Sequence, residues 1–296
     1  MKLKWKHDRG LEGRMLLTMF LLAAVYLLFL AFLVYTGAPQ TFMLLFIGGF
    51  MALQYYYSDR LVLWTMHAKV VTEQEAPELH QTITRLCAIA DLPMPKVAVV
   101  NTSIPNAFAT GRGPKNAVVA VTTGLVDRLD QGELEAVLAH ELSHVKNRDM
   151  AILTIASFIS TLAFYIVRYS FYFGGMGGFG GRRKESGGII AIWIVSLLVW
   201  VISFLLIRAL SRYREFAADR GSAVITGQPS NLVSALTKIS GIMPRIPKED
   251  LRQVEGMNAF FIIPAVSGSV MNLFSTHPST EKRIAALEKI QKELEL

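Results

Sequence analysis

Residues 15–35 read MLLTMFLLAAVYLLFLAFLVY and contain no charged side chain. A helix needs about 20 mostly apolar residues to cross the hydrocarbon core of a bilayer. Residues 41–57 form a second uncharged run, and only residues 36–40 separate the two. A link this short predicts a tight hairpin of two membrane-spanning helices, with both ends on the same side.

Two further apolar runs, residues 151–173 and 189–207, flank a Gly-rich link over residues 174–188. They predict a second hairpin and therefore four transmembrane helices. The basic triplet Arg182, Arg183 and Lys184 in the link would then lie outside the cell, against the usual distribution of charge. The alternative, in which this pair only dips into the membrane or packs against the protein, stays open.

Composition supports a membrane protein and excludes several other classes. Of the 296 residues 52% are hydrophobic and 18% charged, and the single cysteine, Cys87, cannot form an intramolecular disulfide. The net charge of +7 is spread over the N-terminal arm, the Gly-rich link and the span ends, without a basic and aromatic platform for nucleic acid. Basic residues precede the first span and none lies in the first hairpin link, which predicts a cytoplasmic N-terminus.

The remaining polar segments are long enough for one domain built from two parts of the chain. We expect an α+β, mainly helical architecture with short strands over residues 96–101, 107–110 and 117–122, and helices over 75–91, from 131 onward, 211–226, 231–242 and 279–295. The predicted organisation is a basic arm and first hairpin (1–57), the first part of a catalytic domain (58–150), the second hairpin (151–207) and the second part of the domain (208–296).

The helix that begins after Asp130 contains His140-Glu141-Leu142-Ser143-His144. Histidines at positions i and i+4 share one helical face, so both rings can bind one metal ion while Glu141 faces a metal-bound water. The alternative is a pair of solvent-facing histidines on an amphipathic helix. Asn147 and Met150 stand where a metzincin has a glycine and a third histidine, so the third ligand must come from farther along the chain.

Glu215 is the best candidate for that third ligand, and Asp219 lies on the same helical face. Asp219 can accept a hydrogen bond from the ring nitrogen of a ligand histidine that does not bind the metal. An ordinary acidic pair on a solvated face is the alternative. Asp149 is a rival ligand, but it is expected to point off the metal-binding face and to have a structural role at the membrane boundary.

The chain resembles the HtpX membrane metalloproteases, peptidases of the M48 family related to the CAAX prenyl proteases. The resemblance rests on the paired N-terminal spans, residues 106–111 (NAFATG), the histidine motif followed by Asn147-Arg148-Asp149, and Glu215 with Asp219, in that order. Residues 276–278 (THP) with Arg283 and Ile284 are similar to the family's ending. The resemblance implies a zincin-like (gluzincin) domain with one Zn²⁺ per chain, bound by His140, His144 and Glu215.

The resemblance also implies how the site acts. Glu141 would take the proton of a zinc-bound water and return it to the leaving amine. His277 or Arg283 would stabilise the oxyanion, although His277 also fits a helix-entry residue and Arg283 a structural salt bridge. Asn106, Ala107 and Phe108 would belong to an edge strand that binds extended substrate, or to a plain strand and turn. Residues 243–270 are expected to form a loop near the membrane that can touch substrate.

The implied function is endopeptidase cleavage of misfolded or damaged membrane proteins at the cytoplasmic face of a bacterial cell membrane, in the stress response. Its partners would be unfolded substrates, the lipid bilayer and cooperating membrane proteases, with no nucleic acid. The alternatives are a CAAX-type membrane peptidase, which usually has more spans, and a signalling zincin-like sensor, which should show an extra extracellular domain or lack Glu141.

Overall fold

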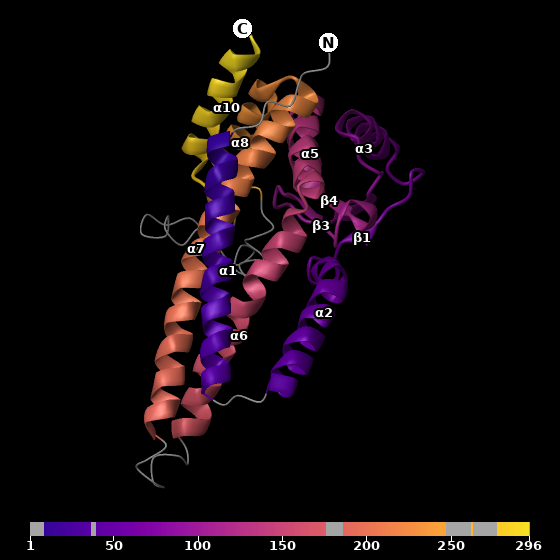
Figure 1. The fold of residues 1–296 in the computed structure, drawn as a ribbon. Helices are drawn as coiled ribbons and strands as arrows, with labels where there is room; N and C mark the ends of the chain where they lie inside the picture. The colour runs from indigo at the N-terminus through magenta and orange to yellow at the C-terminus, as the bar shows by residue number, and fades with distance from the viewer. Residues whose placement is uncertain (1–8, 37–39, 176–185, 247–261, 263–276, 296) are drawn as a thin grey trace.

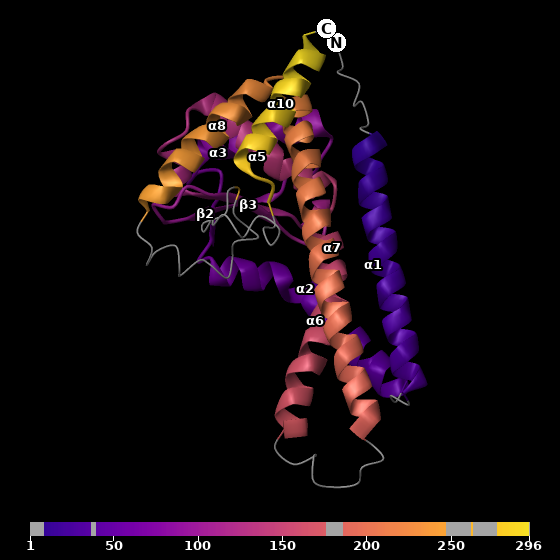
Figure 2. The same ribbon diagram turned by 90° about the vertical axis from the view of Figure 1, so that its left-hand side faces the viewer.

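The protein is described by a computed structural model that covers residues 9–36, 40–175, 186–246, 262 and 277–295. Four long helices dominate it: α1 (Arg9–Tyr35), α2 (Gln40–Thr65), α6 (Asp149–Gly175) and α7 (Ser186–Thr226). Figures 1 and 2 show α1, α6 and α7 side by side in an elongated bundle. The sheet and the shorter helices gather at one end of the bundle, which is also where α1 begins.

Three helices of the described chain are long and apolar enough to cross a membrane, over Arg9–Tyr35, Asp149–Arg168 and Ile190–Thr226. The predicted span over residues 41–57 is helical as part of α2, but α2 is not one of these three. Figure 2 shows α2 strongly inclined to the bundle and running beneath the sheet. Among the described residues, three of the four expected spans are therefore found, and the fourth is not confirmed. Residues 176–185 of the Gly-rich link lie outside the described residues.

The bundle has an apolar interior and an apolar exterior. Phe29, Phe158 and Ala163 are buried between the helices, whereas Leu16 and Phe20 of α1 are 67% and 69% exposed. Large apolar side chains on both faces are unfavourable in water and favourable in lipid. The bundle is therefore built to lie in a bilayer.

The domain at the end of the bundle contains a four-stranded sheet in the order β1-β2-β4-β3. Its strands are β1 (Lys69–Val70), β2 (Lys96–Val100), β3 (Ala107–Thr110) and β4 (Val118–Thr122). Strands β2 and β4 are parallel, and the other two pairs are antiparallel. The three predicted strands are confirmed, and β3 forms an edge of the sheet.

Helices α3 (Pro77–Ala90), α5 (Gln131–Lys146), α8 (Pro229–Ile242) and α10 (Thr280–Leu294) pack with the sheet into one apolar core. The shorter elements are η1 (Pro114–Asn116), α4 (Thr123–Val126) and η2 (Met243–Arg245). Helix α5 starts with a capping box, in which the Asp130 side chain accepts from the Glu133 backbone and the Glu133 side chain accepts from the Asp130 backbone. Most of α5 is buried, so the histidine motif lies inside the domain.

Helix α7 corrects one sequence prediction. The apolar run over residues 189–207 and the polar helix expected over 211–226 are one continuous helix. No glycine or proline interrupts the sequence from Ile189 to Arg220, so nothing breaks the backbone hydrogen bonds between the two. Ser222, near the end of α7, donates to the carbonyl of Ala136 in α5 at 2.6 Å. One helix thus joins the bundle to the helix that carries the histidine motif.

Candidate metal centre

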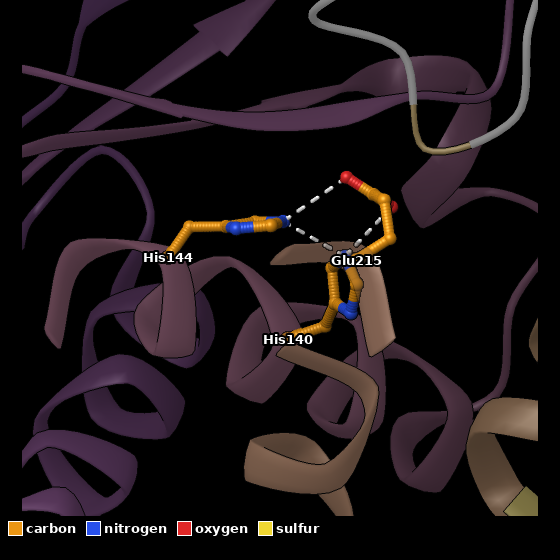
Figure 3. A group of neighbouring side chains, drawn as sticks. All are labelled: His140, His144 and Glu215. Atoms are coloured by element: carbon orange, nitrogen blue, oxygen red, sulfur yellow. Dashed lines mark hydrogen bonds and ion pairs between the residues drawn. The ribbon is translucent and has the colours of Figure 1, made fainter. Parts of the chain in front are cut away.

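Three side chains from two helices meet at the base of the domain (Figure 3). His140 and His144 project from the same face of α5, and Glu215 comes from α7. The His140 Nε2 and His144 Nε2 atoms are 3.1 Å apart. A Glu215 oxygen lies 3.7 Å from the first nitrogen, and its other oxygen lies 3.5 Å from the second. The three residues thus direct donor atoms at one point, as the sequence predicted.

These donors fit a zinc ion. Zinc binds imidazole nitrogen and carboxylate oxygen at about 2.0–2.2 Å in a tetrahedron, which places neighbouring donors roughly 3.4 Å apart. The observed separations lie close to that value, and among the described residues this is the one group of histidine, cysteine and acidic side chains that can hold a metal. Three protein ligands leave one position of the tetrahedron for water or substrate.

Asp149 has a different role from the one that the sequence suggested. Helix α5 ends at Lys146, and Arg148 adopts a left-handed conformation with φ of 55°. This turn brings Asp149 back to His144, whose Nδ1 lies 2.6 Å from the Asp149 carboxylate. Buried Arg214 of α7 forms an ion pair with the same carboxylate. The prediction that Asp149 points off the metal-binding face was wrong, because it extended the helical periodicity past the end of α5.

Asp219 lies where the helical spacing predicted. Its carboxylate is 3.0 Å from Nδ1 of His140. The guanidinium of Arg283, in α10, donates two hydrogen bonds to Asp219, at 2.9 Å and 2.6 Å, and lies 3.4 Å from Glu215. Arg283 is 1% exposed, so the structure places it behind the metal ligands as a salt-bridge partner. Its contact with substrate stays a prediction.

Burial sets the proton affinities of the motif on α5. Burial raises the pKa of Glu141 above its ordinary value, which makes this carboxylate a stronger base than an exposed one. Burial lowers the pKa of His144. In His140 burial acts in the same direction, but hydrogen bonds to Asp219 and Glu215 outweigh it and raise the pKa to about 9. A metal must therefore displace a proton from His140.

A pocket next to the three ligands joins the metal centre to the edge of the sheet. It is lined by Ala107, Phe108 and Ala109 of β3 and by Glu141, with apolar side chains from Met150, Leu153 and Ile262. His277 also lines it, with Nδ1 3.1 Å from Glu215. Strand β3 and His277 thus lie beside the metal ligands, and their roles toward substrate stay predictions.

Asn106 is engaged with the protein's own backbone. Its side-chain oxygen accepts a hydrogen bond from the amide of Ile262 at 3.0 Å, and Arg283 donates to the carbonyl of Ile262 at 2.8 Å. The rest of the predicted substrate loop, residues 247–261 and 263–276, lies outside the described residues. Sequence reasoning missed Ile262 and Arg214, since neither belongs to a motif. The contact of Asp149 with His144 could have been predicted, because Asp149 directly follows the turn that ends α5.

Fold and site together define a membrane metalloprotease. Two histidines and a glutamate on the last two turns of one buried helix meet a carboxylate from a helix that continues into an apolar bundle. The profile of Peptidase family M48 matches residues 73–291, and the chain belongs to that family.

Relatives that match nearly the whole chain carry protease names. The chain is 72% identical to protease HtpX homolog 2 of Methanosarcina acetivorans, over 99% of this chain and 100% of the relative. It is 61% identical to protease HtpX homolog of Moorella thermoacetica, over 97% of each chain. The expected HtpX-type relationship is therefore confirmed.

The fold is also found in a solved structure. The crystal structure of S. mikatae Ste24p superposes with a TM-score of 0.57 at 20% identity, covering 94% of this chain and 67% of that chain. At this identity the likeness concerns the fold alone.

Proposed function

We propose that the protein is a zinc-dependent endopeptidase that cleaves unfolded or damaged membrane proteins at the cytoplasmic face of the cell membrane. The observation that carries the proposal is the convergence of His140, His144 and Glu215 at zinc-ligand spacing, with buried Glu141 beside them. When bound, zinc supplies a Lewis acid for the peptide carbonyl and acidifies water.

Glu141 is the general base of the proposed reaction. Its raised pKa lets it take the proton of the attacking water and then donate it to the leaving amine. His277 lines the same pocket and is the proposed hydrogen-bond donor to the oxyanion. Asp149 and Asp219 keep the two ligand rings in the tautomer that leaves Nε2 for the metal.

Strand β3 is the proposed binding site for substrate. It pairs with β4 on one side and borders the pocket on the other. An extended peptide can add to such an edge through main-chain hydrogen bonds, which require no particular sequence. Asn106 would then position either the substrate or, as in this structure, the backbone amide of Ile262. Unfolded segments of membrane proteins fit this mode, because they expose extended backbone.

The proposed setting is a cell membrane with the N-terminus and the metal centre in the cytoplasm. Helix α2 would complete four spans with α1, α6 and α7, which returns both halves of the domain to one side. Damaged substrates would reach the site during membrane stress, alone or with cooperating proteases.

The experiment uses the full chain purified in detergent with zinc. Glu141→Gln should retain zinc and the thermal unfolding midpoint but lose peptide cleavage by at least 10²-fold, because an amide cannot take the proton. Casein cleavage and zinc content are measured side by side. The matched control is Glu135→Gln, six residues earlier on α5 and partly exposed, which should cleave normally. Near-native cleavage by Glu141→Gln would assign the base to another residue.

Orientation is tested by labelling single cysteines in intact cells with a membrane-impermeant thiol reagent. Cysteines at Gln131 and Gln228, both exposed on the domain, should stay unlabelled if the domain is cytoplasmic. Cys87 is buried with its pKa raised to about 11, so the native chain should serve as a blank after cell lysis. Labelling of Gln228→Cys in intact cells would place the second half of the domain outside.

A further inference from the structure

A second cavity lies away from the metal centre, between α2 and the turn that follows β3. Its volume is about 440 Å³, and it is lined by Gly49, Ala52, Leu53, Tyr56, Tyr57, Arg60 and Arg112. None of these seven described residues is acidic. The cavity therefore combines positive charge with aromatic and small apolar side chains.

The two arginines are held against tyrosine rings. The Arg112 guanidinium lies 5.1 Å from the centre of the Tyr56 ring, and the Arg60 guanidinium lies 6.0 Å from the centre of the Tyr57 ring. A guanidinium can rest on an aromatic face and still bind a phosphate through its N–H groups. Two such groups around one cavity favour a ligand with a phosphate or a similar anion.

The other side of the cavity is apolar and open. A Cβ atom built on Gly49 would meet no atom within 4 Å. Along α2, Leu45, Leu53 and Leu61 are 70%, 57% and 60% exposed. Trp64, near the end of α2, is 75% exposed, and tryptophan and tyrosine are enriched where a membrane meets water. The ligand should therefore carry an apolar part that can run along α2.

We propose that this cavity binds an anionic phospholipid of the surrounding bilayer. Its phosphate contacts Arg60 and Arg112, and an acyl chain lies along α2 past Gly49. Arg112 is two residues beyond the end of β3, the strand that lines the metal pocket. A bound lipid thus holds the turn at the end of that strand. The proposal needs a membrane but not peptidase activity, so it stands or falls separately from the proposed function.

The test measures lipid binding to the full chain in detergent by native mass spectrometry. Phosphatidylglycerol is titrated and compared with phosphatidylcholine of the same acyl chains. Each basic residue near a membrane contributes about fivefold in affinity. The double variant Arg60→Gln/Arg112→Gln should therefore bind phosphatidylglycerol ~30-fold more weakly than the native chain. The matched control is Arg9→Gln/Arg85→Gln, which removes the same charge at exposed sites elsewhere and should bind as the native chain does.

A second variant keeps both arginines. Gly49→Leu should fill the open side of the cavity and weaken phosphatidylglycerol binding at least tenfold, and it decides the question if the double variant fails to fold. Inorganic phosphate at millimolar concentration should not displace the lipid. The proposal is overturned if the double variant and its control bind phosphatidylglycerol equally, or if Gly49→Leu binds it as the native chain does. It is also overturned if inorganic phosphate fully displaces the lipid, which would indicate a site for free phosphate.

Discussion

The two metal-binding histidines are each held by a carboxylate and an arginine, but the two chains of contacts are built differently. His144 contacts Asp149, five residues away across a tight turn, and Asp149 pairs with Arg214. His140 contacts Asp219, which comes from another helix and pairs with Arg283 from a third. We call these the local relay (His144, Asp149, Arg214) and the distant relay (His140, Asp219, Arg283).

The difference between the relays lies in what each one joins. The distant relay links α5, α7 and α10, and its arginine also approaches Glu215 at 3.4 Å. The local relay depends on one turn and on α7, and the His144 side chain keeps 15% of its surface exposed, against 1% for His140. The distant relay therefore has a role in holding the domain together as well as in orienting a ligand.

Removing the arginines should show the largest difference. Arg283→Met removes a guanidinium that donates two hydrogen bonds to buried Asp219, and breaking a buried ion pair typically lowers the free energy of unfolding by about 3–5 kcal/mol. Arg214→Met should cost less, about 1–3 kcal/mol, because Arg214 pairs with Asp149, whereas Arg283 contacts Asp219 and also lies 3.4 Å from Glu215. Thermal unfolding of the zinc-loaded proteins in detergent measures both.

The matched control for these variants is Arg220→Met. The Arg220 guanidinium lies 3.7 Å from the carboxylate of Glu293, which is half exposed. It should change stability by less than about 1 kcal/mol. Equal losses for Arg283→Met and Arg214→Met would show that the two relays contribute alike, against the asymmetry seen in their contacts.

The carboxylates should differ next, in metal affinity. Replacing a residue that orients a metal ligand typically costs about 10–100-fold. The loss of zinc affinity for Asp219→Asn should lie near the upper end of this range, because Asp219 also positions Arg283 beside Glu215. The loss for Asp149→Asn should lie near the lower end. Zinc affinity is measured by competition with a chromophoric chelator, with exposed Asp91→Asn as the control. A larger loss for Asp149→Asn would reverse the order of the relays.

The turn of the local relay should give the smallest effect. Arg148→Gly suits the left-handed backbone and should change the free energy of unfolding by less than about 1 kcal/mol. Arg148→Val should cost about 1–3 kcal/mol and weaken zinc binding, since a β-branched residue resists this conformation and moves Asp149. Both are compared by thermal unfolding and chelator competition. Unchanged zinc affinity in Arg148→Val would show that Asp149 does not depend on this turn.

Helical periodicity explains which parts of the site the sequence predicted. His140, His144, Glu215 and Asp219 obey an i, i+4 rule within uninterrupted helices, so their shared faces followed from spacing alone. The three strands and the start of α5 after Asp130 also matched, because alternation and helix caps are local signals. Strand β1, with two residues, was too short to show such a pattern.

The remaining features depend on geometry that no local pattern carries. Asp149 follows a residue with positive φ, where helical spacing no longer applies. Arg283 reaches the site because α10 packs against α7, and it donates there to the carbonyl of Ile262. The inclination of α2 depends on how the domain sits on the bundle (Figure 2). Its apolar sequence predicted a membrane-spanning helix but not this inclination.

The unbroken course of α7 sets a length scale for the metal centre. Glu215 is eight positions beyond Ile207, the last of the apolar run, and at 1.5 Å per residue this is about 12 Å of helix. An extended polypeptide needs roughly four residues to cover the same distance. In the proposed reaction, a peptide bond of the substrate that lies closer to the bilayer than this cannot reach the metal centre unless its segment is first drawn out of the lipid. The barrier to cleavage would then depend on how firmly the segment is anchored in the membrane rather than on its sequence.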